Sequence, residues 1–268
     1  MNQAPYSTQW SKPPQIIKSS IWRWIMGLFC LAYLWLAIGS IEINWLRIYE
    51  GLERAQRFIA GFLQPDFSTR WRDISAGMVE SLTMTLTFTV VGIALAIPVG
   101  LGAARNLSPT WVYMICRAFI ALSRSLQEII VAIFFVALFG FGAFAGFLTL
   151  TFATMGFIGK LLAEEIEGID PTPIEAIQAT GASWLQRVNY AIQPQVLPRL
   201  LGLCLYRLDI NFRESAVIGI VGAGGIGATL NTSLSRYEYD SAGAILLLII
   251  AIVMLSEYAS GYLRKYVK

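Results

Sequence analysis

SLTMTLTFTVVGIALAIPVGLGAA, residues 81–104, decides the fold, because this stretch is apolar and carries no charged residue. A helix needs about 20 predominantly apolar residues to cross the hydrocarbon core of a bilayer. Threonines at 83, 85, 87 and 89 alternate with other residues, as in a strand, but a lone strand in lipid leaves its backbone hydrogen bonds unmade. The stretch therefore predicts a membrane-spanning helix over about residues 77–104, whose hydroxyl and small residues favour close contact with neighbouring helices.

The composition of the whole chain also indicates an integral membrane protein. Of its 268 residues, 56% are hydrophobic and 14% are charged, whereas a soluble domain carries about a quarter charged residues. Because the chain has no histidine, it lacks the usual general base and the commonest metal ligand, and we expect no catalytic residue, metal or cofactor. A net charge of +3 does not indicate nucleic-acid binding. Cys30, Cys116 and Cys204 lie far apart in apolar stretches, which favours packing over a disulfide or metal site.

Uncharged runs predict about six transmembrane helices and hence an all-α fold. Besides the helix described above, spans are expected at about residues 22–41, 112–140, 147–162, 198–221 and 242–260. A cleaved signal peptide is the alternative for the first run, but the long preceding segment and the lack of a clear cleavage site favour a span. The sequence GFGAFAG at 140–146 separates the third span from the fourth.

The segment 42–76 differs from the spans, because it mixes arginines with apolar residues. Its apolar positions recur at spacings of three and four, which is typical of an amphipathic helix at the membrane surface. An ordinary solvated connector is an equally good interpretation of this segment.

The distribution of charge predicts the orientation of the chain. With six spans, both termini lie on one side of the membrane, as tails of residues 1–21 and 263–268. If that side is cytoplasmic, ten lysines and arginines lie inside and six outside, which follows the positive-inside rule. Residues 42–76 would then be periplasmic. We expect a multi-pass protein of the bacterial inner membrane, in contact with the lipid bilayer.

The loop at about 163–197 contains EAIQATGASWLQRVNYAIQPQVLP, residues 175–198. This pattern predicts a short helix beginning at Glu175, a tight turn at Gly181, and a second helix ended by Pro194 and Pro198. Two short helices at an angle form a compact knob, which can dock in a groove of a partner and transmit rigid-body motion.

This loop resembles the coupling loop of the integral-membrane subunits of ABC importers, and the resemblance covers about residues 77–268. Glu175, Ala176, Gly181 and Pro194 match the pattern Glu-Ala-Ala, three residues, Gly, nine residues, Ile-x-Leu-Pro. Three positions depart from it: Ile177, Ala191 and Gln193. The resemblance implies a type I permease core over residues 77–262. It also implies two ATPase subunits bound to the coupling loops, a periplasmic substrate-binding protein and a second permease copy in a homodimer.

The fifth span carries an unusual set of charges, in the sequence YRLDINFRES. Arg207, Asn211 and Glu214 share one helix face by their spacing, and Asp209 and Arg213 share another. A charge inside the bilayer is expensive, so it normally faces a partner or an aqueous path.

The third span holds a second polar group, in which Arg124 and Glu128 are four residues apart. Two interpretations of both groups remain open. In the first, the charges pair with one another and hold helices or subunits together. In the second, arginines such as Arg207 or Arg213 bind an oxyanion, because a guanidinium group can donate two parallel hydrogen bonds to phosphate-like oxygens.

A charged fifth span that leads into VIGIVGAGGIG is similar to the phosphonate and phosphite permeases among the ABC importers. This resemblance implies import of phosphonate or a related phosphorus oxyanion such as phosphite, hypophosphite or a phosphate ester. The alternatives are the same machinery for methionine or a betaine-type substrate, and an ion-coupled secondary transporter. A secondary transporter would show repeated halves and would have no use for a coupling knob.

Four glycines end the fifth span, and Gly222, Gly224 and Gly227 satisfy the pattern G-x-G-x-x-G. A dinucleotide site would require a preceding strand and an alternating α/β domain. Both flanks here are of membrane-spanning length. We therefore expect these glycines, with Gly225, to allow a tight re-entry of the chain or a close contact between subunits.

Overall fold

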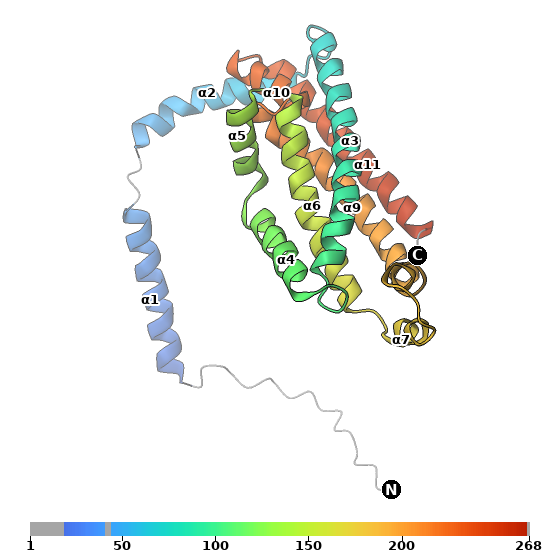
Figure 1. Ribbon diagram of the computed structural model, residues 1–268. Coiled ribbons are helices and arrows are strands. Elements are labelled where there is room, and N and C mark those ends of the chain that lie inside the picture. Colours follow the sequence, from blue (N-terminus) through green and yellow to red (C-terminus); the bar gives the residue numbers. More distant parts are fainter. Residues whose placement is uncertain (1–18, 41–43, 267–268) are drawn as a thin grey trace. The chain divides into compact units, whose positions relative to one another are not determined.

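The computed structural model describes residues 19–40 and 44–266, and these residues form α-helices, one short π-helical segment and no strand (Figure 1). The predicted all-α fold is thus confirmed. Contacts divide the chain into two compact units, Met1–Ala55 and Gln56–Lys268. The predicted N-terminal tail covers residues 1–21, and residues 1–18 of it lie outside the described part of the chain.

The first unit contains helix α1, Ser20–Gly39, which corresponds to the first predicted span and begins two residues earlier. The helix buries none of its residues, and large apolar side chains such as Trp24, Leu31 and Trp35 are exposed around it. Its 20 residues extend about 30 Å, which matches the hydrocarbon thickness of a bilayer. Lipid is the environment in which such an apolar surface is stable.

Helix α2, Trp45–Leu63, confirms that most of the segment 42–76 is helical. The boundary at residue 76 is wrong, because α3 already begins at Trp71. Arg70 fixes this start: its guanidinium lies 2.9 Å from Asp73 and 2.9 Å from Glu238. Arg70 and Asp73 therefore lie at the beginning of α3, where they pair with each other and Arg70 also pairs with Glu238.

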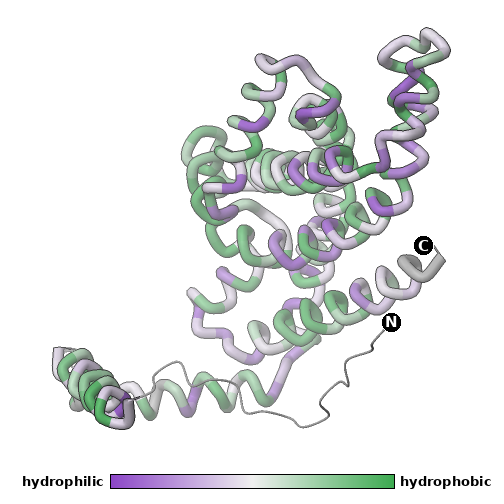
Figure 2. The backbone as a smooth tube through the Cα atoms, turned by 90° about the horizontal axis from the view of Figure 1, so that it is seen from below, coloured by the Kyte–Doolittle hydropathy of each residue, from purple (hydrophilic) through white to green (hydrophobic). Residues whose placement is uncertain are grey.

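The described part of the second unit is a bundle that contains four helices of 25 to 33 residues, and Figure 2 shows hydrophobic residues along much of each long helix. Its elements after α2 are α3 (Trp71–Ala103), α4 (Thr110–Ser125), α5 (Glu128–Phe139), α6 (Ala143–Glu167), α7 (Thr172–Ala179), α8 (Trp184–Arg187), the π-helical η1 (Val188–Ile192), α9 (Gln193–Ile220), α10 (Gly225–Ser235) and α11 (Tyr239–Tyr266). Among the described residues, five helices are long and apolar enough to cross a membrane, or six if α4 and α5 count as one bent span.

The alternating threonines of α3 lie in a helix, as predicted. Thr83, Thr85 and Thr87 each donate a hydrogen bond to the carbonyl four residues earlier, at 2.7–2.9 Å. These hydroxyls are therefore satisfied within the helix, and glycines elsewhere in α3 allow close packing. Gly92 lies against Thr154 of α6, where a Cβ atom would overlap the threonine side chain.

The third predicted span is broken, which corrects the expectation of one helix over 112–140. Helices α4 and α5 meet at an angle of 96°, because Leu126 and Gln127 adopt extended backbone conformations. The Ser123 hydroxyl donates to the carbonyl of Phe152 on α6 at 3.0 Å and holds the end of α4 in place. The predicted break at 140–146 is confirmed, although α6 begins at Ala143 rather than Phe147.

Two predictions about the second half of the chain were wrong. Pro194 and Pro198 do not end a helix: Pro194 lies in the first turn of α9, Pro198 lies inside the same helix, and α8, η1 and α9 follow one another without a loop. The glycine-rich connector after residue 221 contains helix α10, which packs against α3 and α9. In addition, α11 continues to Tyr266, so the predicted tail at 263–268 is helical over its described part.

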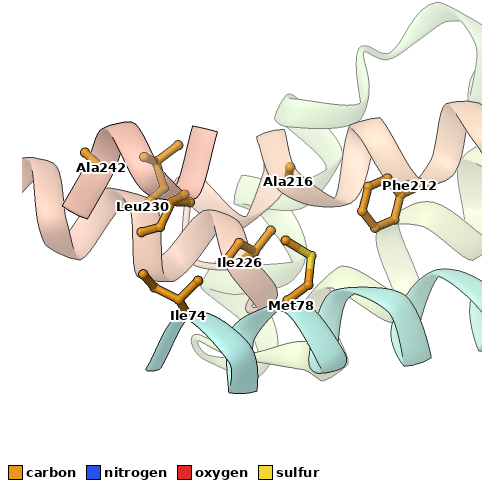
Figure 3. Packing of buried hydrophobic residues seen from close by; sticks show 8 residues of the cluster. Ile74, Met78, Phe212, Ala216, Ile226, Leu230 and Ala242 are labelled. Carbon is orange, nitrogen blue, oxygen red and sulfur yellow. The ribbon is translucent and has the colours of Figure 1, made fainter. Parts of the chain in front are cut away.

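A hydrophobic core joins α3, α9, α10 and α11 at one end of the bundle (Figure 3). Ile74 and Met78 of α3 face Ile226 of α10, and Phe212 of α9 lies beside them in the same cluster. The short helices α7 and α8 lie at the other end of the bundle (Figure 1). The fold therefore separates two ends, with the intramembrane charges between them.

Candidate functional site

The predicted knob is present as α7, a turn and α8. Glu175 lies in the first turn of α7, and its side chain is exposed and has no partner among the described residues. Ala176 beside it is exposed as well. Asp170 holds the start of this helix by accepting from the backbone N–H and the hydroxyl of Thr172, at 2.9 and 2.7 Å. These hydrogen bonds lower the pKa of the Asp170 carboxyl below its ordinary value.

Gly181 makes the turn, as predicted, with a φ of 78° that favours glycine. Ser183 then starts α8 through a capping box: its hydroxyl accepts from the N–H of Gln186, and its own N–H donates to the Gln186 side chain at 2.8 Å. This box was missed in the sequence, although Ser-x-x-Gln after a glycine turn is its usual signature. The turn between the two helices is thus fixed on both sides.

The knob is anchored to the membrane helices by polar contacts. The Trp184 indole N–H donates to the carbonyl of Leu107 at 3.3 Å, and Gln195 of α9 accepts from the N–H of Asp170 at 3.2 Å. Pro194 lies at the start of α9 rather than in the knob. The knob can therefore act as a rigid docking element, with the Glu175 carboxylate available to a partner.

A buried ion pair lies inside the bundle on α9. The Arg207 guanidinium lies 3.1 Å from Glu214, and the Arg207 side chain is only 1% exposed. Arg207 Nε also donates to the hydroxyl of Thr154, at 3.3 Å. Asn211 on the same face donates to Thr89 at 2.8 Å and to Thr154 at 2.9 Å. The predicted common face of these α9 residues is therefore confirmed, and it points toward α3 and α6.

The polar group of the third span joins this ion pair. Phe157 of α6 lies 5.1 Å from the Arg207 guanidinium and 5.4 Å from that of Arg124, measured from its ring centroid. Arg124 and Glu128 are close enough to act electrostatically on both Arg207 and Glu214. We call these residues the central polar cluster: Arg124, Glu128, Arg207, Asn211 and Glu214.

Asp209 and Arg213 form a separate pair on another face of α9. Their charged groups are 3.4 Å apart, as the spacing predicted. Asp209 also accepts a hydrogen bond from Ser256 of α11, a partner that the sequence did not reveal. Asp209 lines an apolar cavity between α3, α9 and α11, and its side chain is 8% exposed. The seven candidate residues are therefore divided between two sites rather than one network.

Gly222 and Gly224 lie in the tight turn between α9 and α10, and Gly225 and Gly227 lie in the first turn of α10. Gly224 and Gly225 have φ values of 84° and 70°, and a side chain at Gly227 would overlap the carbonyl of Ala216 on α9. The Gly222 carbonyl accepts from the N–H of Gly142 at 2.9 Å. A helix, rather than a strand, precedes this turn, so the geometry of a dinucleotide site is not present.

The cysteines Cys30, Cys116 and Cys204 are all unbonded. Within residues 19–40 and 44–266, no three histidine, cysteine or acidic side chains lie close enough together to hold a metal ion. The arrangement offers a docking knob and a set of intramembrane charges, both of which suit transport.

Comparisons with known proteins agree with this arrangement. The family described as "Binding-protein-dependent transport system inner membrane component" matches residues 96–267. The phosphite transport system permease protein PtxC of Stutzerimonas stutzeri is 39% identical over 232 residues, which cover 86% of this chain and 83% of that protein. The phosphate-import permease protein PhnE of Mycolicibacterium smegmatis is 37% identical over 229 residues, or 85% of this chain, but the match spans only 43% of PhnE.

A solved structure shares the fold. The methionine ABC transporter MetNI in an inward-facing conformation contains a chain with a TM-score of 0.65 and 26% identity to this protein. The match covers 73% of this chain and 96% of that one.

We predict that Arg207→Met destabilises the protein by roughly 3 kcal/mol, the lower end of the range for a buried pair, because the Glu214 side chain, which is only 24% exposed, loses its partner. The double variant Arg207→Met/Glu214→Met removes both charges and should recover much of this loss. Arg199→Met is the matched control on the same helix, since Arg199 is 73% exposed in its pair with Glu165. Thermal unfolding of the detergent-solubilised protein measures all three. Equal decreases in the unfolding temperature for Arg207→Met and Arg199→Met would show that the Arg207–Glu214 pair stabilises the protein no more than an exposed ion pair does.

Proposed function

The chain belongs to the family of inner-membrane components of binding-protein-dependent transport systems, and on this premise we propose that it imports a phosphorus oxyanion as an ABC permease subunit. One observation supports the substrate class. The relatives are named for phosphite and phosphate transport, and the spans of this chain contain arginines that suit such anions. Guanidinium groups match the oxygens of such anions. The transported class would include phosphite, phosphonate and related anions.

Relatives with other printed substrates are more distant. A probable D-methionine permease of Vibrio cholerae is 26% identical over 202 residues, against 39% for the phosphite permease. The family membership also favours an ATP-driven importer over an ion-coupled carrier. Methionine import is therefore the second candidate, with less support from the sequence and none from the intramembrane arginines.

In the proposed mechanism, the knob docks on a separate ATPase subunit, and the exposed Glu175 carboxylate contributes to this contact. ATP binding and hydrolysis then move the knob as a rigid body. Because α8, η1 and α9 follow one another without a loop, a displacement at Trp184 reaches Arg207 along a continuous helical element. ATP chemistry thus stays on the partner, while this chain opens and closes the path.

The same proposal assigns the orientation and the partners. The end that carries α7 and α8 faces the ATPase and is cytoplasmic, with both chain termini on that side. A periplasmic binding protein delivers the anion at the end that carries α10. One chain supplies one knob, so a pair of ATPase subunits is matched by a homodimer of this chain. The second copy would also shield from lipid the side of the bundle with exposed polar residues such as Arg124 and Gln127, because lipid cannot solvate them, and the aqueous path would lie between the two copies.

We predict that the importer, assembled in liposomes with its ATPase and binding protein, takes up labelled phosphite and a phosphonate only when ATP and binding protein are present. Methionine and glycine betaine serve as control substrates and should not accumulate. Accumulation of methionine in place of both phosphorus compounds would contradict the proposed substrate class. Uptake driven by an ion gradient without ATP would contradict the proposed energy source.

We predict that Glu175→Lys and Gly181→Val each lower phosphite uptake at least tenfold and detach or uncouple the ATPase. Lysine reverses the charge presented to the partner, and valine disfavours the positive φ of the turn by roughly 1–2 kcal/mol. Gly181→Asn is the matched control, since asparagine tolerates this conformation better and should retain more activity. Uptake and ATP hydrolysis are measured on the same liposomes. Normal transport-linked ATP hydrolysis in both variants would rule out a coupling role for the knob.

A further inference from the structure

Four arginines lie inside the predicted spans and away from their first two residues, which excludes Arg23 and Arg199, and these four differ in their partners. Three are held by carboxylates at 2.8–3.4 Å, in the pairs Arg117–Glu167, Arg207–Glu214 and Arg213–Asp209. Arg124 forms no ion pair within the part of the chain that the structure describes. A cation inside a membrane protein requires a partner or an aqueous path. Arg124 is therefore the intramembrane cation that is left available.

Arg124 lies at the break between α4 and α5. It belongs to the last turn of α4, roughly 20 Å from the start of that helix, and its side chain is exposed. In Figure 1 the break is seen alongside α6, about halfway between the end with α7 and the end with α10. The neighbouring Ser125 and Gln127 are also exposed, so further hydrogen-bonding groups lie next to the guanidinium.

The position of Arg124 is fixed by packing rather than by a loop. Ser123 donates to the Phe152 carbonyl, and Gly156 lets α4 approach α6 so closely that a Cβ there would overlap Ser123. The guanidinium rests on the face of Phe157. A charged group held in this way loses little conformational freedom when it binds a ligand.

Arg207, the other arginine that contacts the Phe157 ring, is not available to bind a ligand in this structure. Arg207 is buried, and its charge is compensated by Glu214. Its guanidinium instead supports Phe157 from within the bundle, so the Arg207–Glu214 pair positions the ring under Arg124. Glu128 belongs to the same central polar cluster, and its negative charge weakens the binding of an anion there. Weak binding suits a transport path, because an ion must leave as readily as it enters.

We propose that Arg124 is the guanidinium that contacts the phosphorus oxyanion as it passes the break between α4 and α5. This inference rests on the proposed function. It transfers the role from the paired Arg207 and Arg213 to Arg124, the arginine of the central polar cluster that forms no ion pair among the described residues. The guanidinium donates N–H groups to the anion oxygens, and Arg207 acts as a positioning residue through Phe157.

The test uses the complete importer in liposomes, with saturating phosphite-loaded binding protein. Arg124→Gln should lower the initial rate of phosphite uptake at least tenfold while the complex still assembles. Arg124→Lys should give an intermediate rate, because it restores the charge but not the planar fork. Arg213→Gln is the matched control, which removes a paired intramembrane arginine, and should stay within about twofold of the unaltered importer.

A second measurement separates contact from a structural role. Phenylglyoxal modifies accessible arginines, and peptide mass spectrometry reads each position. Phosphite should slow the labelling of Arg124 in the importer without slowing that of the exposed Arg72. Normal uptake by Arg124→Gln together with unprotected Arg124 would overturn the inference while the proposed function stands. An unaltered importer that moves neither phosphite nor a phosphonate would overturn the proposed function itself.

Discussion

One buried amide holds the three central helices together. Asn211 of α9 donates to Thr89 of α3 and to Thr154 of α6, and the residue has no exposed surface. Helices in lipid gain no hydrophobic free energy by associating, so hydrogen bonds and close contacts between small residues hold them. Gly92 provides such a contact against Thr154, and Arg207 donates to the same threonine. We call α3, α6 and α9, as joined by Asn211, the central frame. The Arg207–Glu214 ion pair depends on this frame, because Arg207 donates to the same Thr154 that Asn211 contacts.

This frame connects the two functional parts of the molecule. Helix α9 carries Arg207 and Asn211 in its middle and continues through η1 into α8, which forms half of the knob. The anchor from Trp184 to the carbonyl of Leu107 ties the knob to the segment between α3 and α4. In the proposed mechanism, a force on the knob is thus passed both to the central polar cluster and toward α4, whose far end carries Arg124. The proposed coupling element and the proposed substrate path would then move together.

The residues alone predicted the spans, the knob turn at Gly181 and the common face of Arg207, Asn211 and Glu214, because these follow from local composition and helical spacing. The break at Leu126 and Gln127 could not be predicted, since no glycine or proline marks it and the Ser123 contact with α6 is tertiary. Helix α10 was missed because its glycines have low helix propensity, whereas close packing against α9 selects them. Arg124 and Arg207 lie at the same Phe157 ring, and Asp209 instead contacts Ser256 of α11. Both results likewise depend on which helices pack against one another, which the sequence alone does not show.

The central claim is that the break between α4 and α5 faces an aqueous path for the anion. The most direct measurement is the reaction of a cysteine at this break with a charged, membrane-impermeant thiol reagent. The variant is Gln127→Cys, made in an importer whose native cysteines Cys30, Cys116 and Cys204 are alanine, and Ile250→Cys on the exposed face of α11 is the lipid-facing control. We expect that Gln127→Cys reacts during ATP turnover, that phosphite slows this reaction, and that Ile250→Cys stays unreactive. A Gln127→Cys that reacts no faster than Ile250→Cys would contradict the central claim.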